Sequence, residues 1–186
     1  MKFGPASPAD AIGGVTVHTL RQGSLVLKKG TSIGAVHISQ ALAPLARSLD
    51  YDVTVVDPRT AFASPERFPD VPLIAEWPDV ALPPLNVDPY TAFVAVTHDP
   101  KIDDPALLHA FQRDCFYIGA LGSRKTHAKR AERLRAQGAK ETDIARIHAP
   151  IGLAIGAVSP SEIAVSIMAE ITAQLRLPPK EKEEAA

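Results

Sequence analysis

The segment Ala92-Phe93-Val94-Ala95-Val96-Thr97-His98-Asp99 decides the fold of this chain. Its five consecutive apolar residues predict a strand that is buried on both faces, which is typical of a parallel sheet with helices on each side. Thr97, His98 and Asp99 follow directly, at the carboxyl end of the strand. Open α/β sheets bind ligands outside this end of their strands, so the segment predicts both the sheet and the place of a site.

Strand and helix patterns alternate on either side of this segment. Residues 28–33, 53–56 and 115–118 predict further strands, and residues 72–75 predict one more. A helix is expected over residues 36–49, where apolar side chains return every three or four positions. We therefore expect an α/β fold with a doubly wound (Rossmann-like), mostly parallel sheet and helices on both faces.

Capping residues predict where three other helices begin. Asp104-Pro105 combines an N-cap acid with a first-turn proline and predicts a helix through Phe111. Ser123 is expected to cap a basic helix that ends at Gly138. Ser159-Pro160-Ser161-Glu162 is a capping box, and it predicts the start of the last helix.

Length and composition limit the class of protein. The 186 residues suit one domain, and we expect a short N-terminal appendage over residues 1–30, a Rossmann-like domain over 31–177 and a charged, disordered tail over 178–186. The chain has 20 Lys or Arg and 21 Asp or Glu, a formal net charge of −1. This balance argues against a nucleic acid or an anionic membrane as partner.

Cysteine usage and hydropathy indicate the compartment. Cys115 is the single cysteine, so no disulfide can form within the chain, and it is interpreted as a small buried apolar residue in a reducing compartment. No apolar run approaches the roughly 18 residues of a membrane span. The first residues lack the apolar region of a signal peptide, so we expect a cytoplasmic protein.

The first candidate ligand-binding turn is at Gly34. Asp57 follows it by about 20 residues, the spacing at which a dinucleotide-binding unit places an acid for a ribose hydroxyl. Backbone amides at the start of the next helix, near His37, would face a phosphate. Gly34 alone represents the pattern G-x-G-x-x-G, so the alternative is a plain turn, with Asp57 initiating another turn before Pro58.

The second candidate turn is Gly119-Ala120-Leu121-Gly122-Ser123-Arg124-Lys125. Its two glycines permit a close approach of the backbone or a positive φ. Its two cations stand at a helix N-terminus, where the helix dipole disfavours them, and this favours a bound anion such as a phosphate. The alternative is a solvated basic helix.

The candidate binding residues all belong to one edge of the expected sheet. His98 and Asp99 also suit acid–base chemistry, with an Asx-type turn before Pro100 as the alternative. The histidines and acids of the chain lack the spacing of a metal-binding motif, so no metal site is predicted. The candidates are Gly34, His37, Asp57, Arg59, Thr97, His98, Asp99, Gly119, Leu121, Gly122, Ser123 and Arg124.

Seven ordered segments carry a resemblance to a known family: residues 34–38, 53–59, 62–68, 96–104, 117–124, 147–153 and 159–164. Together they resemble the Rossmann-type C-terminal domain of the XdhC/CoxI family. The resemblance implies an accessory protein that binds the molybdenum cofactor, as the pterin (molybdopterin) or its nucleotide form. It further implies insertion of the cofactor into an apo-molybdoenzyme of the xanthine dehydrogenase or CO dehydrogenase type, and association with a cofactor-sulfurating enzyme.

Two functions of other classes stay open beside this non-catalytic chaperone. One is an NAD(P)-dependent oxidoreductase, in which Asp57 would select NAD over NADP by repelling a 2′-phosphate. The other is a nucleotide-binding or interaction domain without catalysis. The apolar last helix is expected either to cover the sheet or to form a homodimer.

Overall fold

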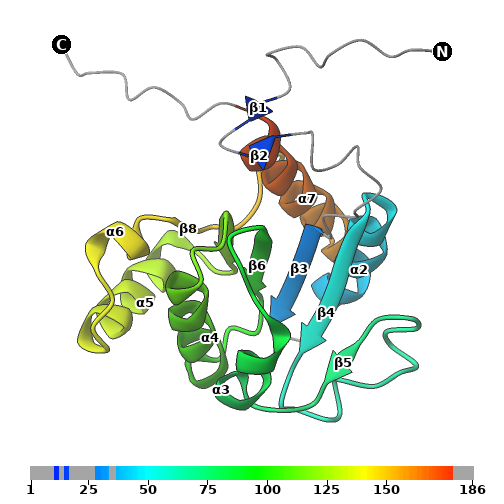
Figure 1. The fold of residues 1–186 in the computed structure, drawn as a ribbon, viewed down its shortest axis with the longest axis horizontal. Coiled ribbons are helices and arrows are strands. Elements are labelled where there is room, and N and C mark those ends of the chain that lie inside the picture. The colour runs from blue at the N-terminus through cyan, green and yellow to red at the C-terminus, as the bar shows by residue number, and fades with distance from the viewer. Residues whose placement is uncertain (1–10, 13–14, 17–27, 34–36, 178–186) are drawn as a thin grey trace.

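A computed structural model describes residues 11–12, 15–16, 28–33 and 37–177. Its centre is a six-stranded sheet in the order β5-β4-β3-β6-β7-β8, and all neighbouring strands are parallel (Figure 1). The strands are β3 (Lys28–Ile33), β4 (Tyr51–Val56), β5 (Leu73–Ile74), β6 (Thr91–Ala95), β7 (Tyr117–Ala120) and β8 (Ile147–His148). A separate pair, β1 (Ala11–Ile12) and β2 (Val15–Thr16), is antiparallel.

Helices cover both faces of the large sheet, which confirms the predicted fold class. One face carries α2 (His37–Ser48) and α7 (Pro160–Arg176), which pack against each other. The other carries α3 (Pro78–Ala81), α4 (Pro100–Gln112), α5 (Arg124–Ala136) and α6 (Glu141–Ile144) (Figure 1). A short 3-10 helix, η2 (Pro83–Leu85), precedes β6.

Strand β6 shows why two cores form. All its residues are buried, as the continuous apolar run predicts. Ala92 and Val94 belong to the core under α2 and α7, whereas Phe93 and Ala95 belong to the core under α4 and α5. The alternation of a strand therefore sends apolar side chains into both layers.

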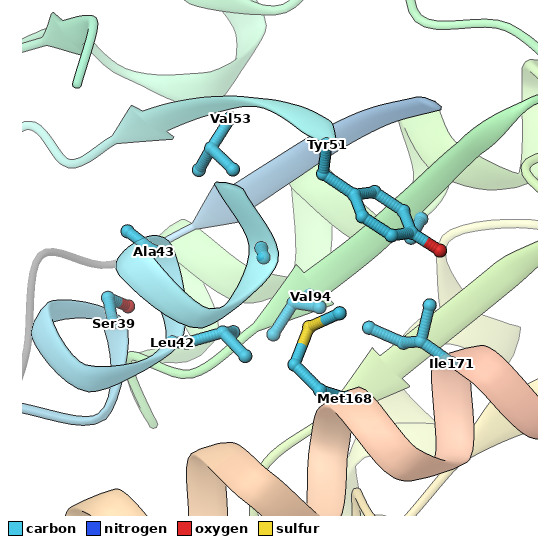
Figure 2. A pocket seen from close by; sticks show the side chains of 10 residues that line it. Ser39, Leu42, Ala43, Tyr51, Val53, Val94, Met168 and Ile171 are labelled. Carbon is cyan, nitrogen blue, oxygen red and sulfur yellow. The ribbon is translucent and has the colours of Figure 1, made fainter. Parts of the chain in front are cut away.

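The core under α2 and α7 contains a small apolar cavity of about 30 Å³ (Figure 2). It is lined by side chains of both helices and of β4 and β6. Gly30 of β3 lies in register between Val53 and Ala92, two of the lining residues. The lining residues are Ser39, Leu42, Ala43, Ala46, Tyr51, Val53, Ala92, Val94, Met168 and Ile171.

The predicted start of α4 is wrong by one turn. Asp99, not Asp104, is the N-cap, and its side chain accepts a hydrogen bond of 2.9 Å from Lys101 N. Pro100 takes the first helical position, where its missing N–H costs nothing. Pro105 lies inside the helix, and Asp104 is held by Arg133 at 2.6 Å. Two Asp-Pro pairs, Asp99-Pro100 and Asp104-Pro105, stand in this stretch of the sequence, and the helix begins at the first.

The other predicted boundaries agree with the structure to within about two residues, and the largest shift is that of the strand predicted at residues 115–118, which is β7 at residues 117–120. Ser123 caps α5, Gly138 follows it with a φ of 88°, and Ser159 and Glu162 form the capping box of α7. The expected strand at residues 72–75 is β5. Residues 147–148, for which no strand was predicted, form strand β8 beside β7. The expected tail at residues 178–186 lies outside the described residues.

Candidate functional site

Four neighbouring strands end at the same level of the sheet. Ile33 lies in register with Val56 on one side and Ala95 on the other, and Ala95 lies in register with Ala120. The chain passes from β3 to β4 on one side and reaches β6 on the other, so the strand order reverses between β3 and β6. Such a switch point forms a crevice that binds ligands in open α/β sheets. We call this place the strand-end crevice.

The structure brings most of the predicted site residues to this crevice. Residues 57–59 follow β4, residues 97–99 follow β6, and residues 121–124 follow β7. His37 begins α2 and is exposed. Gly34, between β3 and α2, lies outside the described residues.

Gly119 has a different place from the other candidates. It lies inside β7, between Val94 and His148. A Cβ at this position would stand 2.5 Å from Ile151 Cδ1 and 2.8 Å from Tyr117 Cε1. A larger residue would therefore force the side chains of Ile151 and Tyr117 to shift, so this glycine has a packing role that is independent of any ligand.

Asp57 is fully buried and is bound by its neighbour Arg59. Oδ1 accepts from Arg59 Nε at 2.9 Å and from Arg59 N at 3.0 Å, and Oδ2 accepts from Arg59 Nη2 at 2.7 Å. This two-pronged hydrogen bond raises the pKa of Arg59, with Asp99 and Asp103 adding to the effect. The segment after β4 thus exposes a cation to the crevice and not a bare carboxylate.

The turn after β6 is held by Thr97. Its Oγ1 donates to Asp103 Oδ1 at 2.6 Å and accepts from Asp99 N at 3.0 Å. His98 has a φ of 65°, a left-handed conformation that sharply reverses the chain between β6 and α4, and its side chain is exposed. Thr97 and Asp99 therefore build the turn, while His98 is presented to the crevice.

The turn after β7 begins helix α5 with cations. Gly122 has a φ of 131°, and a Cβ there would stand 2.9 Å from Thr126 Cγ2. Ser123 accepts from Thr126 N at 3.2 Å as the N-cap. Arg124 and Lys125 follow, both exposed. The first turns of α4 and α7 contain Asp103 and Glu162, whereas the first turn of α5 contains no acid.

A buried ion pair beneath this edge was not predicted from the sequence. Arg130 of α5 and Asp103 of α4 are 2% and 1% exposed, and Nη2 and Oδ2 lie 3.9 Å apart. Arg130 Nη2 also donates to Leu121 O at 2.7 Å, which fixes the turn after β7. Burial raises the pKa of Asp103, against the opposing effects of Thr97, Arg130 and His98. The available signal was the helical spacing of Arg130 and Leu134, which places the arginine on the buried face.

A second cluster that sequence reasoning missed lies under α7. Glu170 Oε2 accepts from Tyr117 Oη at 2.6 Å and from Gly152 N at 2.8 Å, and Oε1 lies 3.1 Å from His148 Nδ1. The rings of Tyr117 and His148 lie 4.7 Å apart. The cluster joins β7, β8 and the segment before α7 to one carboxylate.

Residues 37–177 and the described strands provide no metal site, no membrane-spanning helix and no activated thiol. No three His, Cys, Asp or Glu side chains there are grouped as metal ligands would be. No helix in this part of the chain has the length and apolar character needed to cross a membrane. Cys115 is buried, as predicted, and burial raises its pKa to about 12, so it is not an activated thiol.

Comparisons with known proteins decide the family. Residues 32–171 match the family of XdhC Rossmann domains, which accounts for most of the chain. The chain belongs to this family. The resemblance expected from the ordered motifs is therefore confirmed.

Three curated proteins are similar in sequence to this XdhC domain. It is 34% identical over 174 residues to the uncharacterised protein YqeB of Escherichia coli and 36% identical over 131 residues to a probable xanthine dehydrogenase subunit of Bacillus subtilis. It is 31% identical over 139 residues to the molybdenum cofactor insertion chaperone PaoD of E. coli. These alignments cover 88%, 70% and 75% of this chain but 31%, 38% and 37% of the relatives. The XdhC domain thus spans about a third of the length of these proteins.

A solved structure has the same fold. It is the crystal structure of a xanthine dehydrogenase from Bacillus halodurans, with a TM-score of 0.70 and 27% sequence identity. The similarity covers 86% of this chain and 45% of that protein.

Proposed function

We propose that this XdhC domain binds the molybdenum cofactor in the strand-end crevice and assists its insertion into an apo-molybdoenzyme of the xanthine dehydrogenase type. The start of α5 is the observation that carries the proposal. Its free backbone amides, with Arg124 and Lys125 beside them and no acid in the first turn, favour an anion such as the phosphate of the cofactor. Similarity to the chaperone PaoD supports the choice of ligand.

The donor set of the crevice fits the phosphate end of this ligand. Arg59 and Arg124 offer guanidinium donors, and His37 and His98 are exposed at the same edge. The described residues offer no thiolate there, since Cys115 is buried inside the other core. The bound cofactor would supply the metal chemistry of the client enzyme, while this chain would hold and orient its phosphate.

The proposal is of a non-catalytic chaperone, and an NAD(P)-dependent oxidoreductase is the competing function. An NAD site of the ordinary kind uses a carboxylate after the second strand to bind the ribose hydroxyls. Here both oxygens of Asp57 bind Arg59, so this contact would have to be shared. Association with a cofactor-sulfurating enzyme and formation of a homodimer belong to the same proposal, and co-purification and the solution mass would test them.

Calorimetry with molybdopterin, its nucleotide forms, NAD and NADP tests the proposal. We expect cofactor binding, and Arg124→Gln should weaken it about tenfold, the usual effect of losing one charge-assisted hydrogen bond. Lys129→Gln is the matched control, because Lys129 is an exposed cation further along the same helix. Tight binding of NAD without any binding of the cofactor would refute the chaperone function.

A further inference from the structure

We propose that Arg59, Phe62 and Arg67 form a subsite for a phosphate monoester at the β4 side of the strand-end crevice. The inference deepens the proposed function and rests on it, because it assigns a group of the ligand to the segment after β4. The comparisons assign no role to these three residues, and Phe62 and Arg67 were not among the candidates expected from the sequence.

The subsite consists of two cations on one aromatic ring. Arg59 Cζ lies 4.6 Å from the centroid of the Phe62 ring, and Arg67 Cζ lies 5.4 Å from it. The two guanidinium carbons are therefore no more than about 10 Å apart. Phe62 is 38% exposed, so the ring and its cations lie at the surface of the protein. Two like charges at this distance repel each other, and an anion between them would relieve the repulsion.

Each guanidinium is fixed on one side and free on the other. Asp57 binds Nε and Nη2 of Arg59. Gln40 of α2 accepts from Arg67 Nη2 at 2.9 Å and donates to Arg67 O at 3.4 Å. Nη1 of Arg59, and Nε and Nη1 of Arg67, have no hydrogen-bond partner among the described residues. The donors are thus preorganised, and several remain for a ligand.

The charge balance of the cluster favours an anion. The Asp57 carboxylate neutralises Arg59, but the side-chain partner of Arg67 is the neutral Gln40. The ring therefore has one unbalanced positive charge and a second cation beside it. A phosphate monoester is negatively charged at neutral pH and accepts several hydrogen bonds, so it suits both the unbalanced cation and the unused N–H donors.

The place of the subsite in the fold agrees with this ligand. It follows β4, which lies beside β3 at the switch point of the sheet. In doubly wound sheets this segment faces the ribose of a bound nucleotide, and an arginine there accommodates a ribose phosphate. The phosphate could also be that of the pterin, so the experiment must separate the two sources.

Calorimetry with 2′-AMP, 5′-AMP, adenosine and molybdopterin tests the subsite. We expect at least one phosphate-bearing probe to bind about tenfold more tightly than adenosine. Arg67→Gln should remove most of this gain. Phe62→Leu, which deletes the ring but keeps an apolar side chain, should reduce it as well, and thermal unfolding would show that both variants are folded. Equal affinity of all probes, or an unchanged affinity in Arg67→Gln, would overturn the inference.

Arg47→Gln is the matched control. Arg47 of α2 donates to Asp70 O at 2.9 Å, so it supports the same loop and carries the same charge without contacting Phe62. Its affinities should equal those of the wild type. A loss in Arg67→Gln confined to AMP would indicate a nucleotide phosphate, and a loss confined to molybdopterin would indicate the pterin phosphate; either supports the subsite.

The test separates the subsite from the proposed function. If the wild type binds no cofactor but binds AMP through Arg67, the chaperone function fails and the subsite stands. If the cofactor binds and neither Arg67→Gln nor Phe62→Leu changes any affinity, the subsite alone fails.

Discussion

The Glu170 carboxylate holds three segments together, because it contacts β7, β8 and the segment before α7. Partial burial acts to raise its pKa, but hydrogen bonds from His148, Tyr117 and the Gly152 amide lower it overall. A carboxyl whose pKa is lower in the folded than in the unfolded protein stabilises the fold at pH values above its unfolded pKa, which is near 4.5 here. This contribution is lost as the pH falls from that value through the folded pKa.

We expect Glu170→Gln to lower the free energy of unfolding by about 1–3 kcal/mol at pH 7, because a charged acceptor of buried donors is lost. The melting temperature of the variant should also fall less steeply than that of the wild type below pH 4.5. Thermal unfolding followed from pH 3 to pH 7 measures both effects. Parallel curves for the two proteins would show that Glu170 does not determine the acid sensitivity.

Residues that act through local contacts were predictable, and those that act through distant contacts were not. Asp57, Thr97 and Ser123 could be placed at the strand-end crevice because each lies within three residues of the end of a strand. Arg130 was missed because its partners, Asp103 and Leu121, come from other elements, and nothing in the sequence pairs them. His98 was correctly placed, although its left-handed φ was not foreseen.

At the scale of elements, helix α7 depends on its capping box. Ser159 accepts from Glu162 N at 3.2 Å, and Glu162 Oε2 accepts from Ser159 N at 2.8 Å. We expect Ser159→Ala to destabilise the protein by about 1 kcal/mol, because a first-turn amide loses its acceptor. Ser161→Ala is the control, since Ser161 is exposed and makes no capping bond. Urea denaturation of both variants compares them, and equal stabilities would contradict the role of the box.

Elements with strong end signals were predictable, whereas very short ones were not. Ser123 and Ser159 cap their helices as expected, because capping needs only the next three residues. Strand β8 has two residues and is defined by its pairing with Ile118 and Gly119, so no local pattern indicates it. The start of α4 was misplaced because both Asp99-Pro100 and Asp104-Pro105 satisfy the same local rule.

For the molecule as a whole, the two cores should respond differently to added volume. Ala92 lines the cavity of about 30 Å³ under α2 and α7, while Ala95 faces the other core, where it is fully buried. We expect Ala95→Val to cost about 1–3 kcal/mol through overpacking, and Ala92→Val to cost less than about 1 kcal/mol because the cavity takes up part of the new side chain. Chemical denaturation gives both values, and a larger loss for Ala92→Val would contradict this difference.

The position of the candidate site residues in the fold followed from the sequence more readily than the contacts that they make. Alternating strands and helices place Asp57, Thr97 and Ser123 at one edge in any doubly wound sheet. The sequence suggested that Asp57 would offer its carboxylate to a ribose. The structure shows that carboxylate bound to Arg59, a contact that depends on the path of the chain after Pro58.

The short length of the two edge strands affects how molecules of this protein can associate. Sheet growth from one molecule into the next requires a long row of unpaired backbone N–H and C=O groups. The outer strands of the described sheet, β5 and β8, have two residues each, so they provide almost no such row. Fibril-like stacking through this sheet is therefore blocked at both sides. Loops and helix ends beside the strand-end crevice can then be exposed for recognition without also offering a template for aggregation.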